Sequence, residues 1–299
     1  MSASPSPAIP FSVALLGIAL FAVMDALMKG LVLEMGTYNT MFWRGCVSMV
    51  LAAVLYAWRR PAWPKREVLH LHLQRGVLIA VMAFLFFWGL AYVPIAEAIA
   101  LSFIAPLIAL YLAALLLGER VGSKAVVASV VGFAGALVVM LGKLSGDYDD
   151  NVFRGMAAIL LSALLYAYNL ILQRRQALVS QPVEIVFFQT LALFVLYLTA
   201  APVLAVPPGM DALPGLLITA VLSMGSLMLL SWAYARAEAR VLIPVEYTAF
   251  IWAALFGWLL YDEQLTITTV AGTSLIVAGC LLAASQRDEV VEHVETTSL

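Results

Sequence analysis

The feature that most constrains the fold is a series of long apolar runs that carry almost no charge. The first run extends from Phe11 to Leu33. A helix needs about 20 apolar residues to cross the hydrocarbon core of a bilayer, so this run is long enough to span a membrane. Ten such segments are predicted, at residues 11–33, 37–58, 72–92, 97–117, 124–141, 152–172, 183–205, 213–235, 243–260 and 267–284.

The composition of the 299-residue chain agrees with this pattern. Hydrophobic residues make up 64% of the chain and charged residues 11%, whereas a soluble domain carries about 25% charged residues. A soluble enzyme, a disordered tail protein and a basic nucleic-acid binder are therefore excluded. The expected class is an all-α integral membrane protein.

Lys and Arg residues predict the orientation. Of the sixteen, twelve lie in loops on the side that carries both termini, with Arg75 counted among them, and two lie on the opposite side. Cytoplasmic loops carry the excess of positive charge. We therefore expect a multi-pass protein of the bacterial cytoplasmic (inner) membrane, in contact with lipid, with cytoplasmic tails at 1–10 and 286–299.

An internal repeat divides the chain. Residues 101–136 resemble residues 245–280 at an offset of 144, which aligns Glu119 with Glu263. The repeat predicts two halves of five helices each, at 11–142 and 152–285. An odd number of spans inverts the second half relative to the first, an arrangement typical of secondary transporters that bind substrate near the membrane midplane.

The chain resembles the drug/metabolite transporter superfamily and, within it, the ten-helix EamA-type exporters. The resemblance covers nearly the whole chain and rests on Leu115-Leu116-Leu117-Gly118-Glu119-Arg120 with Gly132-Phe133-Ala134-Gly135, on Leu259-Leu260-Tyr261-Asp262-Glu263 with Ala278-Gly279, and on Phe42-Trp43-Arg44. Asp262 departs from the family pattern, which has Gly there. The resemblance implies solute transport without ATP, often export of amino acids or related metabolites, by a protein that is not an enzyme.

Three charged residues within the first two spans form the first candidate site. Asp25 and Lys29 are four residues apart and share a helix face, and the short hairpin at 34–36 makes Arg44 a neighbour. Charges inside spans are costly and mark functional sites. We expect one ion-paired cluster with a net charge of +1, which suits a ligand carboxylate. A purely structural set of ion pairs is the alternative.

Four further residues are candidates for gating or ion coupling. Glu246 lies near the cytoplasmic end of the ninth span, as either an interface charge or an inner gate, and Glu97 starts the fourth span on the outer side. Tyr92 lies where an interfacial aromatic belt is expected. Pro106 interrupts the fourth span and predicts a kink, because proline removes a backbone hydrogen bond.

Aromatic and amide side chains form a second set of substrate-binding candidates. Phe84 and Trp88 lie one turn apart on the third span, with Tyr92 one turn further on, and such a stripe indicates either packing or a binding wall. The remaining candidates are distributed over the second half of the chain: Tyr166, Asn169, Trp232 and Trp252. Apolar walls with a few polar groups suit amino acids with large side chains, or planar cations.

Small residues and cysteines complete the expectations. Ala128, Gly132 and Ala136 form a ridge that permits close helix packing, within the bundle or in a homodimer. Cys46 and Cys280 lie in apolar runs and are expected to be inert thiols. The three histidines, including His72, fall in a loop or tail, so neither a metal site nor a cofactor is predicted.

The leading interpretation is a secondary transporter that exports amino acids or similar small zwitterionic metabolites, as a monomer or homodimer. The alternatives are a transporter of organic cations, choline-like compounds or drugs, an integral-membrane lipid enzyme, and a membrane scaffold without transport. No nucleic-acid partner is expected.

Overall fold

The computed structural model describes residues 8–59, 63–117, 123–142, 150–177, 179–234, 236 and 245–296. Within these residues the regular structure is helical throughout. The helices are α1 (Ala8–Met35), α2 (Thr37–Arg59), α3 (Arg66–Leu90), α4 (Ile95–Ser102), α5 (Ala105–Leu117), α6 (Ser123–Leu141), α7 (Asp150–Ala177), α8 (Pro182–Leu204), α9 (Ala212–Tyr234), α11 (Thr248–Tyr261) and α12 (Ile267–Thr296).

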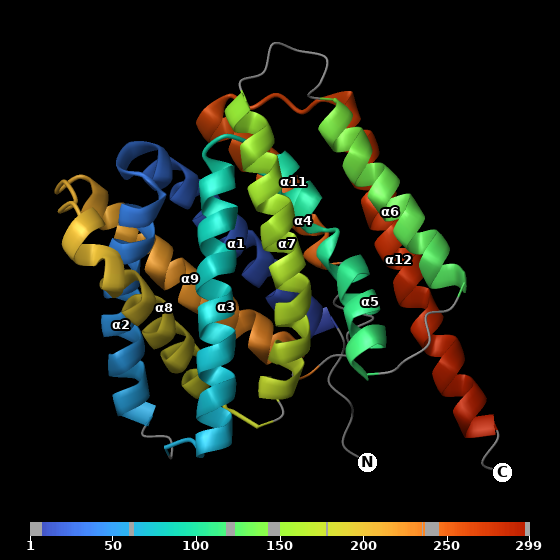
Figure 1. Ribbon diagram of the computed structural model, residues 1–299, viewed down its shortest axis with the longest axis horizontal. Coiled ribbons are helices and arrows are strands. Elements are labelled where there is room, and N and C mark those ends of the chain that lie inside the picture. The colour runs from blue at the N-terminus through green and yellow to red at the C-terminus, as the bar shows by residue number, and fades with distance from the viewer. Residues whose placement is uncertain are drawn as a thin grey trace.

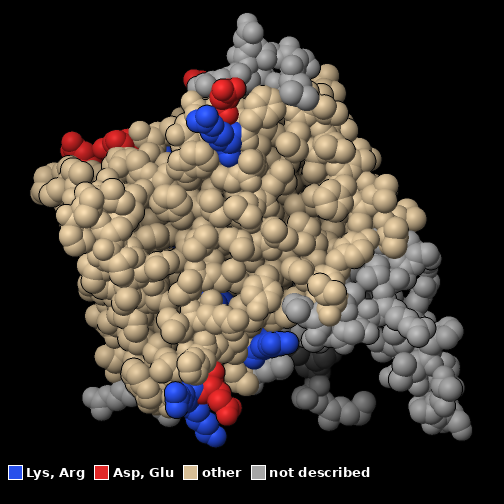
Figure 2. Space-filling view, in the orientation of Figure 1, with Lys and Arg blue, Asp and Glu red and all other residues tan. Residues whose placement is uncertain are grey.

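The helices confirm an all-α membrane protein. Of the described helices, α1, α2, α3, α7, α8 and α9 are long and apolar enough to cross a membrane. Shorter apolar segments occupy the other four predicted spans: Ile95–Ala109, Val126–Leu141, Thr248–Tyr261 and Ile267–Leu282. On the face shown in Figure 2, coloured charged side chains gather near the two ends, and the broad band between them is nearly free of charge.

The bundle has two sides and a centre (Figure 1). Helices α2, α8 and α9 lie on one side, and the pair α6 and α12 forms the opposite edge. Between them lie α1, α3, α4, α7 and α11. The most extensive contacts join α6 with α12, α1 with α9, α3 with α7, and α2 with α8.

The fourth predicted span is broken rather than only kinked. Helix α4 ends at Ser102, and α5 begins at Ala105, directly before Pro106. Proline cannot donate a backbone hydrogen bond and therefore fits the first turn of a new helix. The break exposes the Phe103 carbonyl oxygen, which accepts a hydrogen bond from Cys280 Sγ at 3.2 Å. Both cysteines are free thiols, and Cys280 is buried.

Glycine allows α6 and α12 to approach closely. Of the predicted ridge Ala128, Gly132 and Ala136, the first two residues contact α12 through their backbone at Gly279, and Gly135, which was not part of the predicted ridge, also packs against α12. A Cβ atom at Gly135 would lie 2.5 Å from the Gly272 carbonyl oxygen, and one at Gly279 would lie 2.6 Å from the Ala128 carbonyl oxygen. These distances are too short for any side chain.

Substituting Gly135 with Ala should therefore push α6 away from α12. We expect a loss of about 1–3 kcal/mol in the free energy of unfolding, which is the usual cost of overpacking. Thermal unfolding in detergent measures it. Gly225→Ala is the matched control, since a Cβ at this position of α9 meets nothing within 4 Å. Equal melting temperatures for the two variants would contradict the close packing.

Candidate functional site

A polar pocket lies between α2, α8 and α9, near the middle of each helix. The pocket is partly open, and its empty space, including the part open to the outside, is about 570 Å³. Its polar lining comes from Arg44, Ser48, Gln189, Thr190 and Ser223, and its apolar lining includes Met41, Leu193, Met224 and Leu227. We call this space the Arg44 pocket. Its few polar groups in an otherwise apolar wall are typical of small-molecule sites.

Arg44 contributes a guanidinium with weak partners. One nitrogen donates a hydrogen bond to Ser223 Oγ at 3.1 Å. The other lies 3.6 Å from Met28 Sδ and 3.9 Å from Met24 Sδ. Thioether sulfur is a weak acceptor, and a guanidinium has five N–H groups to satisfy. The positive charge therefore has unused capacity to bind an anion.

The predicted ion-paired cluster of Asp25, Lys29 and Arg44 is wrong in part. Asp25 and Arg44 interact electrostatically, although among the described residues they form no ion pair within 4 Å. Lys29 lies one helical turn beyond Asp25, and its side chain forms an ion pair with a different residue. It binds Glu263, which lies 234 positions away in the sequence. Close spacing along α1 therefore did not place these charges together.

The Lys29 cluster joins three parts of the chain at the end of the bundle where α1 and α3 terminate. Lys29 Nζ lies 2.5 Å from Glu263 Oε1 and donates to the Val93 carbonyl oxygen at 2.8 Å. Glu263 Oε2 accepts from the Ile95 backbone N–H at 2.8 Å. One carboxylate thus neutralises a buried ammonium and also satisfies the free N–H at the start of α4.

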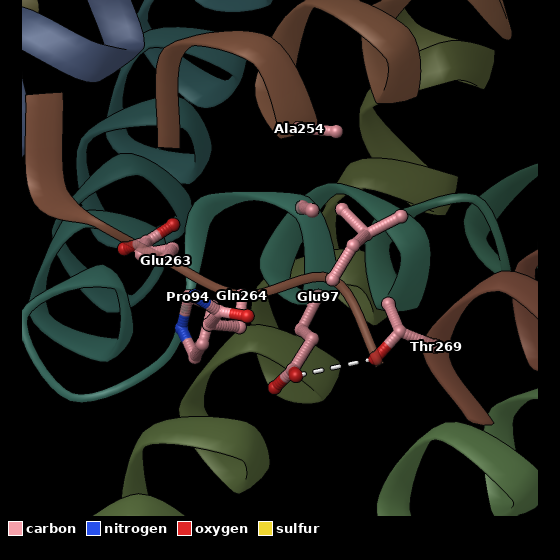
Figure 3. Close-up of a pocket in the computed structure, with 8 residues that line it drawn as sticks. Pro94, Glu97, Ala254, Glu263, Gln264 and Thr269 are labelled. Carbon is pink, nitrogen blue, oxygen red and sulfur yellow. Dashed lines mark hydrogen bonds between the residues drawn. The ribbon is translucent and has the colours of Figure 1, made fainter. Parts of the chain in front are cut away.

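Glu97 lies beside this cluster in a small pocket of about 220 Å³ (Figure 3). It is buried, and its Oε1 accepts a hydrogen bond from Thr269 Oγ1 at 3.2 Å. Glu263 and Gln264 come from the segment between α11 and α12 and line the same pocket. The predicted position of Glu97 at the start of the fourth span is therefore correct, and the structure adds Glu263 as its neighbour.

A second buried polar network, the His72 cluster, lies at the opposite end of α3. His72 was counted among loop or tail residues and Arg75 among cytoplasmic loop residues, although the predicted span 72–92 contains both. The structure supports the span and not the two loop assignments. Both residues lie within α3, with 1% and 5% of their surface exposed. Polar partners on α7 and α8 make this burial possible. These partners, which complete the cluster, are Asn169, Gln176, Ser180 and Glu184.

In the His72 cluster, hydrogen bonds link Arg75 to Glu184 through Gln176 and His72. Arg75 Nε donates to Asn169 Oδ1 at 2.9 Å, and Arg75 Nη1 donates to Gln176 Oε1. Gln176 Nε2 lies 2.5 Å from His72 Nδ1, and His72 Nε2 lies 2.8 Å from Glu184 Oε1. Asn169, predicted to bind substrate, instead belongs to this network.

The predicted aromatic residues do not gather at the Arg44 pocket. Phe84 packs against the core, and the Trp88 and Tyr92 rings meet edge to face at 5.1 Å. Trp232 is 37% exposed and carries Arg236 over its ring at 4.3 Å, which is typical of an interface anchor.

Two further aromatic candidates lie close to the centre of the bundle. Trp252 stacks on Phe256, and its indole Nε1 has no acceptor among the described residues. Tyr166 interacts electrostatically with Glu246 and Arg75. Glu246 is half-buried.

Sequence reasoning missed Ser48, Gln189, Thr190 and Ser223. Each is a neutral polar residue inside an apolar run, and only the packing of α2, α8 and α9 brings them together. The signal that the sequence offered was that hydrogen-bonding side chains stand at positions within the membrane, where an apolar side chain would have no desolvation cost. Among the described residues, no group of three or more His, Cys, Asp or Glu side chains is placed to hold a metal ion.

Comparisons with known proteins agree with this architecture. The model of the EamA-like transporter family matches the chain twice, over residues 9–141 and 153–285. A solved structure with 20% sequence identity covers 95% of this chain and 98% of its own, with a TM-score of 0.58, which shows a shared fold.

Curated relatives include transporters of different small molecules. The pseudopaline exporter of Pseudomonas aeruginosa is 28% identical over 87% of this chain and 90% of its own length. The riboflavin transporter of Rhizobium johnstonii is 31% identical over 70% and 68%. The S-adenosylmethionine uptake transporter of Rickettsia prowazekii is 24% identical over 89% of each. The chain therefore belongs to the EamA-like transporter family, whose members are membrane transporters and not enzymes.

Proposed function

We propose that the protein is a secondary transporter that exports amino acids or similar small zwitterionic metabolites across the bacterial cytoplasmic membrane. It works without ATP, by alternating access between the halves 11–142 and 152–285, and binds its substrate in the Arg44 pocket. The observation that carries the proposal is the Arg44 guanidinium, whose acceptors are one hydroxyl and two thioethers. A ligand carboxylate supplies the charged acceptor that this guanidinium lacks.

The charges near the pocket favour a zwitterion over a simple anion. With Lys29 bound to Glu263, the remaining pair of Asp25 and Arg44 is neutral overall. The two opposite charges are not in contact with each other. A ligand that carries both a carboxylate and an ammonium group matches this neutral pair overall, with its carboxylate on Arg44; Asp25 lies on α1, outside the residues that line the pocket.

Gln189 supports the same orientation. Its Oε1 is buried, lines the pocket and has no hydrogen-bond partner among the described residues. Leaving such an acceptor unsatisfied costs about 1–3 kcal/mol. An N–H or O–H donor on the substrate removes this cost when it binds, and an ammonium group is such a donor.

The relatives support a small metabolite as the substrate. S-adenosylmethionine, named for one relative, contains the amino and carboxylate groups of methionine. The relatives include both an exporter and uptake transporters, so the direction of transport is part of our proposal. An organic cation is the weaker alternative, since the guanidinium in the pocket wall repels it.

Two observations support the division into inverted halves. The family model matches twice at an offset of 144 residues. The offset relates α1 to α7, α2 to α8 and α3 to α9. The helix contacts have the same symmetry: α1 packs on α9 as α7 packs on α3, and α2 packs on α8. At this offset Gly135 corresponds to Gly279, and both meet the backbone of the facing helix.

The Lys29 and His72 clusters supply the two closures that alternating access requires. Val93 lies just beyond the C-terminal end of α3 and His72 lies in the N-terminal part of α3, about 30 Å apart along a helix axis. The Arg44 pocket lies at a level between them. We propose that each cluster closes one entrance to the pocket, with Glu97 and Glu263 at one closure and Glu184 at the other.

The Arg44 pocket is tested first by Arg44→Gln. We expect a rise of about 10- to 100-fold in KM for efflux of labelled amino acids from proteoliposomes, the equivalent of one charge-assisted hydrogen bond. Arg59→Gln, at the exposed end of the same helix, is the matched control and should transport normally. Normal amino-acid efflux by Arg44→Gln, or efflux of a quaternary amine alone, would rule out the proposed site.

Gln189→Leu separates binding from stability. This change removes an unsatisfied buried acceptor, so the melting temperature should stay equal or rise. Transport should nevertheless weaken by about 5- to 30-fold in KM, because the substrate loses an acceptor worth about 1–2 kcal/mol. Parallel melting and efflux measurements check both expectations. If the variant melts earlier, Gln189 has a structural partner and does not serve the substrate.

A double-mutant cycle tests the Lys29 cluster. Lys29→Met alone should cost about 3 kcal/mol of stability, the lower end of the range for a buried pair, because it leaves the half-buried Glu263 without its counter-charge. Adding Glu263→Gln, which keeps an acceptor for the Ile95 N–H, should recover more than 1 kcal/mol. The control cycle of Asp25→Asn with Lys29→Met should be additive. Stronger coupling of Lys29 to Asp25 than to Glu263 would contradict the assigned pairing.

A further inference from the structure

The hydrogen bonds of the His72 cluster fix the protonation state of its imidazole. Arg75 can only donate, so Gln176 must turn its amide oxygen toward Arg75. The Gln176 amide nitrogen then faces His72 and donates to Nδ1. An Nδ1 that accepts a hydrogen bond carries no proton. His72 is therefore the neutral tautomer, with its proton on Nε2 and donated to Glu184.

This arrangement leaves one position at which the ring can take up a proton. A proton on Nδ1 would face the Gln176 NH₂ group, and two donors cannot share a hydrogen bond. Rotating the Gln176 amide would not help, because its NH₂ group would then face Arg75, which is also a donor. Gln176 must therefore leave the cluster when His72 becomes charged.

The same proton strengthens the opposite contact. A charged His72 forms an ion pair with Glu184, which already lies 2.8 Å from Nε2. The Phe188 ring stacks on the imidazole with 4.9 Å between centroids, and an aromatic face stabilises a cation. Proton uptake therefore weakens the contact of α3 with α7 and strengthens the contact of α3 with α8.

Gln176 is placed to transmit this change. It is the penultimate residue of α7, and its backbone carbonyl accepts hydrogen bonds from the N–H groups of Val179 and Ser180. A displaced Gln176 therefore carries with it the turn that leads into α8. The charged and titratable groups around the imidazole are Arg75 on α3, Glu184 on α8, Tyr56 on α2, which interacts with Glu184, and Tyr166 on α7, which interacts with Arg75.

We propose that His72 is a proton-binding site, and that a proton taken up at Nδ1 releases the C-terminal end of α7 from α3. The ligand is a single proton, and no other group is consumed or released. That this release belongs to a transport cycle rests on the proposed function, whereas the proton site itself rests on the geometry of the cluster alone.

The test uses the full chain in lipid nanodiscs and needs no transport. Nitrogen-15 NMR on labelled histidine reports the tautomer and charge of each ring, with only three histidines to assign. Spin labels at the exposed positions Leu73→Cys on α3 and Arg175→Cys on α7, in a chain without Cys46 and Cys280, report the distance between these helices. Both are followed from about pH 8 to about pH 5.5, the range in which histidine changes charge.

In the unaltered cluster we expect the neutral Nε2–H tautomer at the higher pH. Acidification should convert His72 to imidazolium and, over the same pH range, raise the population with the longer label distance. His70→Gln is the matched control, since His70 is exposed on the same helix, and it should leave both changes intact. A ring that stays neutral throughout, or that gains charge without any change in distance, would overturn the proposal.

Gln176→Glu is the decisive variant because it is nearly isosteric. A carboxylate accepts from Arg75 and from a protonated Nδ1 at once, so the conflict disappears. We expect imidazolium already at about pH 8 and no acid-induced lengthening. A response to acid like that of the unaltered chain would overturn the proposed role of Gln176. If both changes occur but no amino acid is transported, the proton site stands and the proposed function fails.

Discussion

A charged side chain buried within a membrane-spanning bundle must form an ion pair or hydrogen bonds with other polar groups of the protein, because neither water nor lipid tails solvate it there. Lys29 forms an ion pair with Glu263, and the Glu184 carboxylate lies within hydrogen-bond distance of His72. Arg75 donates hydrogen bonds to the side-chain amides of Asn169 and Gln176. Each of these pairings joins segments that are distant in the sequence. Arg44 differs, because its hydrogen-bond acceptors are a hydroxyl and two thioethers, and Asp25 acts on it without an ion pair within 4 Å. The proposed substrate site depends on that difference.

The two segments that the family model matches, 9–141 and 153–285, differ in their polar residues. At the repeat offset Lys29 corresponds to Gln173, which is exposed, and Asp25 corresponds to Asn169, which binds Arg75. The cluster at one end of the bundle is an ion pair of Lys29 with Glu263. The cluster at the other end contains histidine. If both clusters act as the closures that we propose, this difference would let one of them respond to protons while the other does not.

Much of the architecture could be predicted from the sequence, because apolar length determines where helices lie. The predicted span at 37–58 became Thr37–Arg59, and Pro106 marked the break between α4 and α5. The pairing of charges could not be predicted, since proximity along α1 suggested Asp25 for Lys29 while the actual partner lies 234 positions away. His72 and Arg75 were misplaced because a polar residue at the start of an apolar run resembles a loop residue. Only their partners on α7 and α8 explain their burial.

The central claim is that Arg44 recognises the carboxylate of a zwitterion. The most direct measurement compares the binding of amino acids with that of their methyl esters, which keep the ammonium group and lack the carboxylate charge. Calorimetry on the purified protein should show that the esters bind at least about 10-fold more weakly, since a charge-assisted hydrogen bond contributes about 1.5–3 kcal/mol. Arg44→Gln should abolish the difference. Equal affinity for amino acids and esters in the unaltered protein would contradict the account.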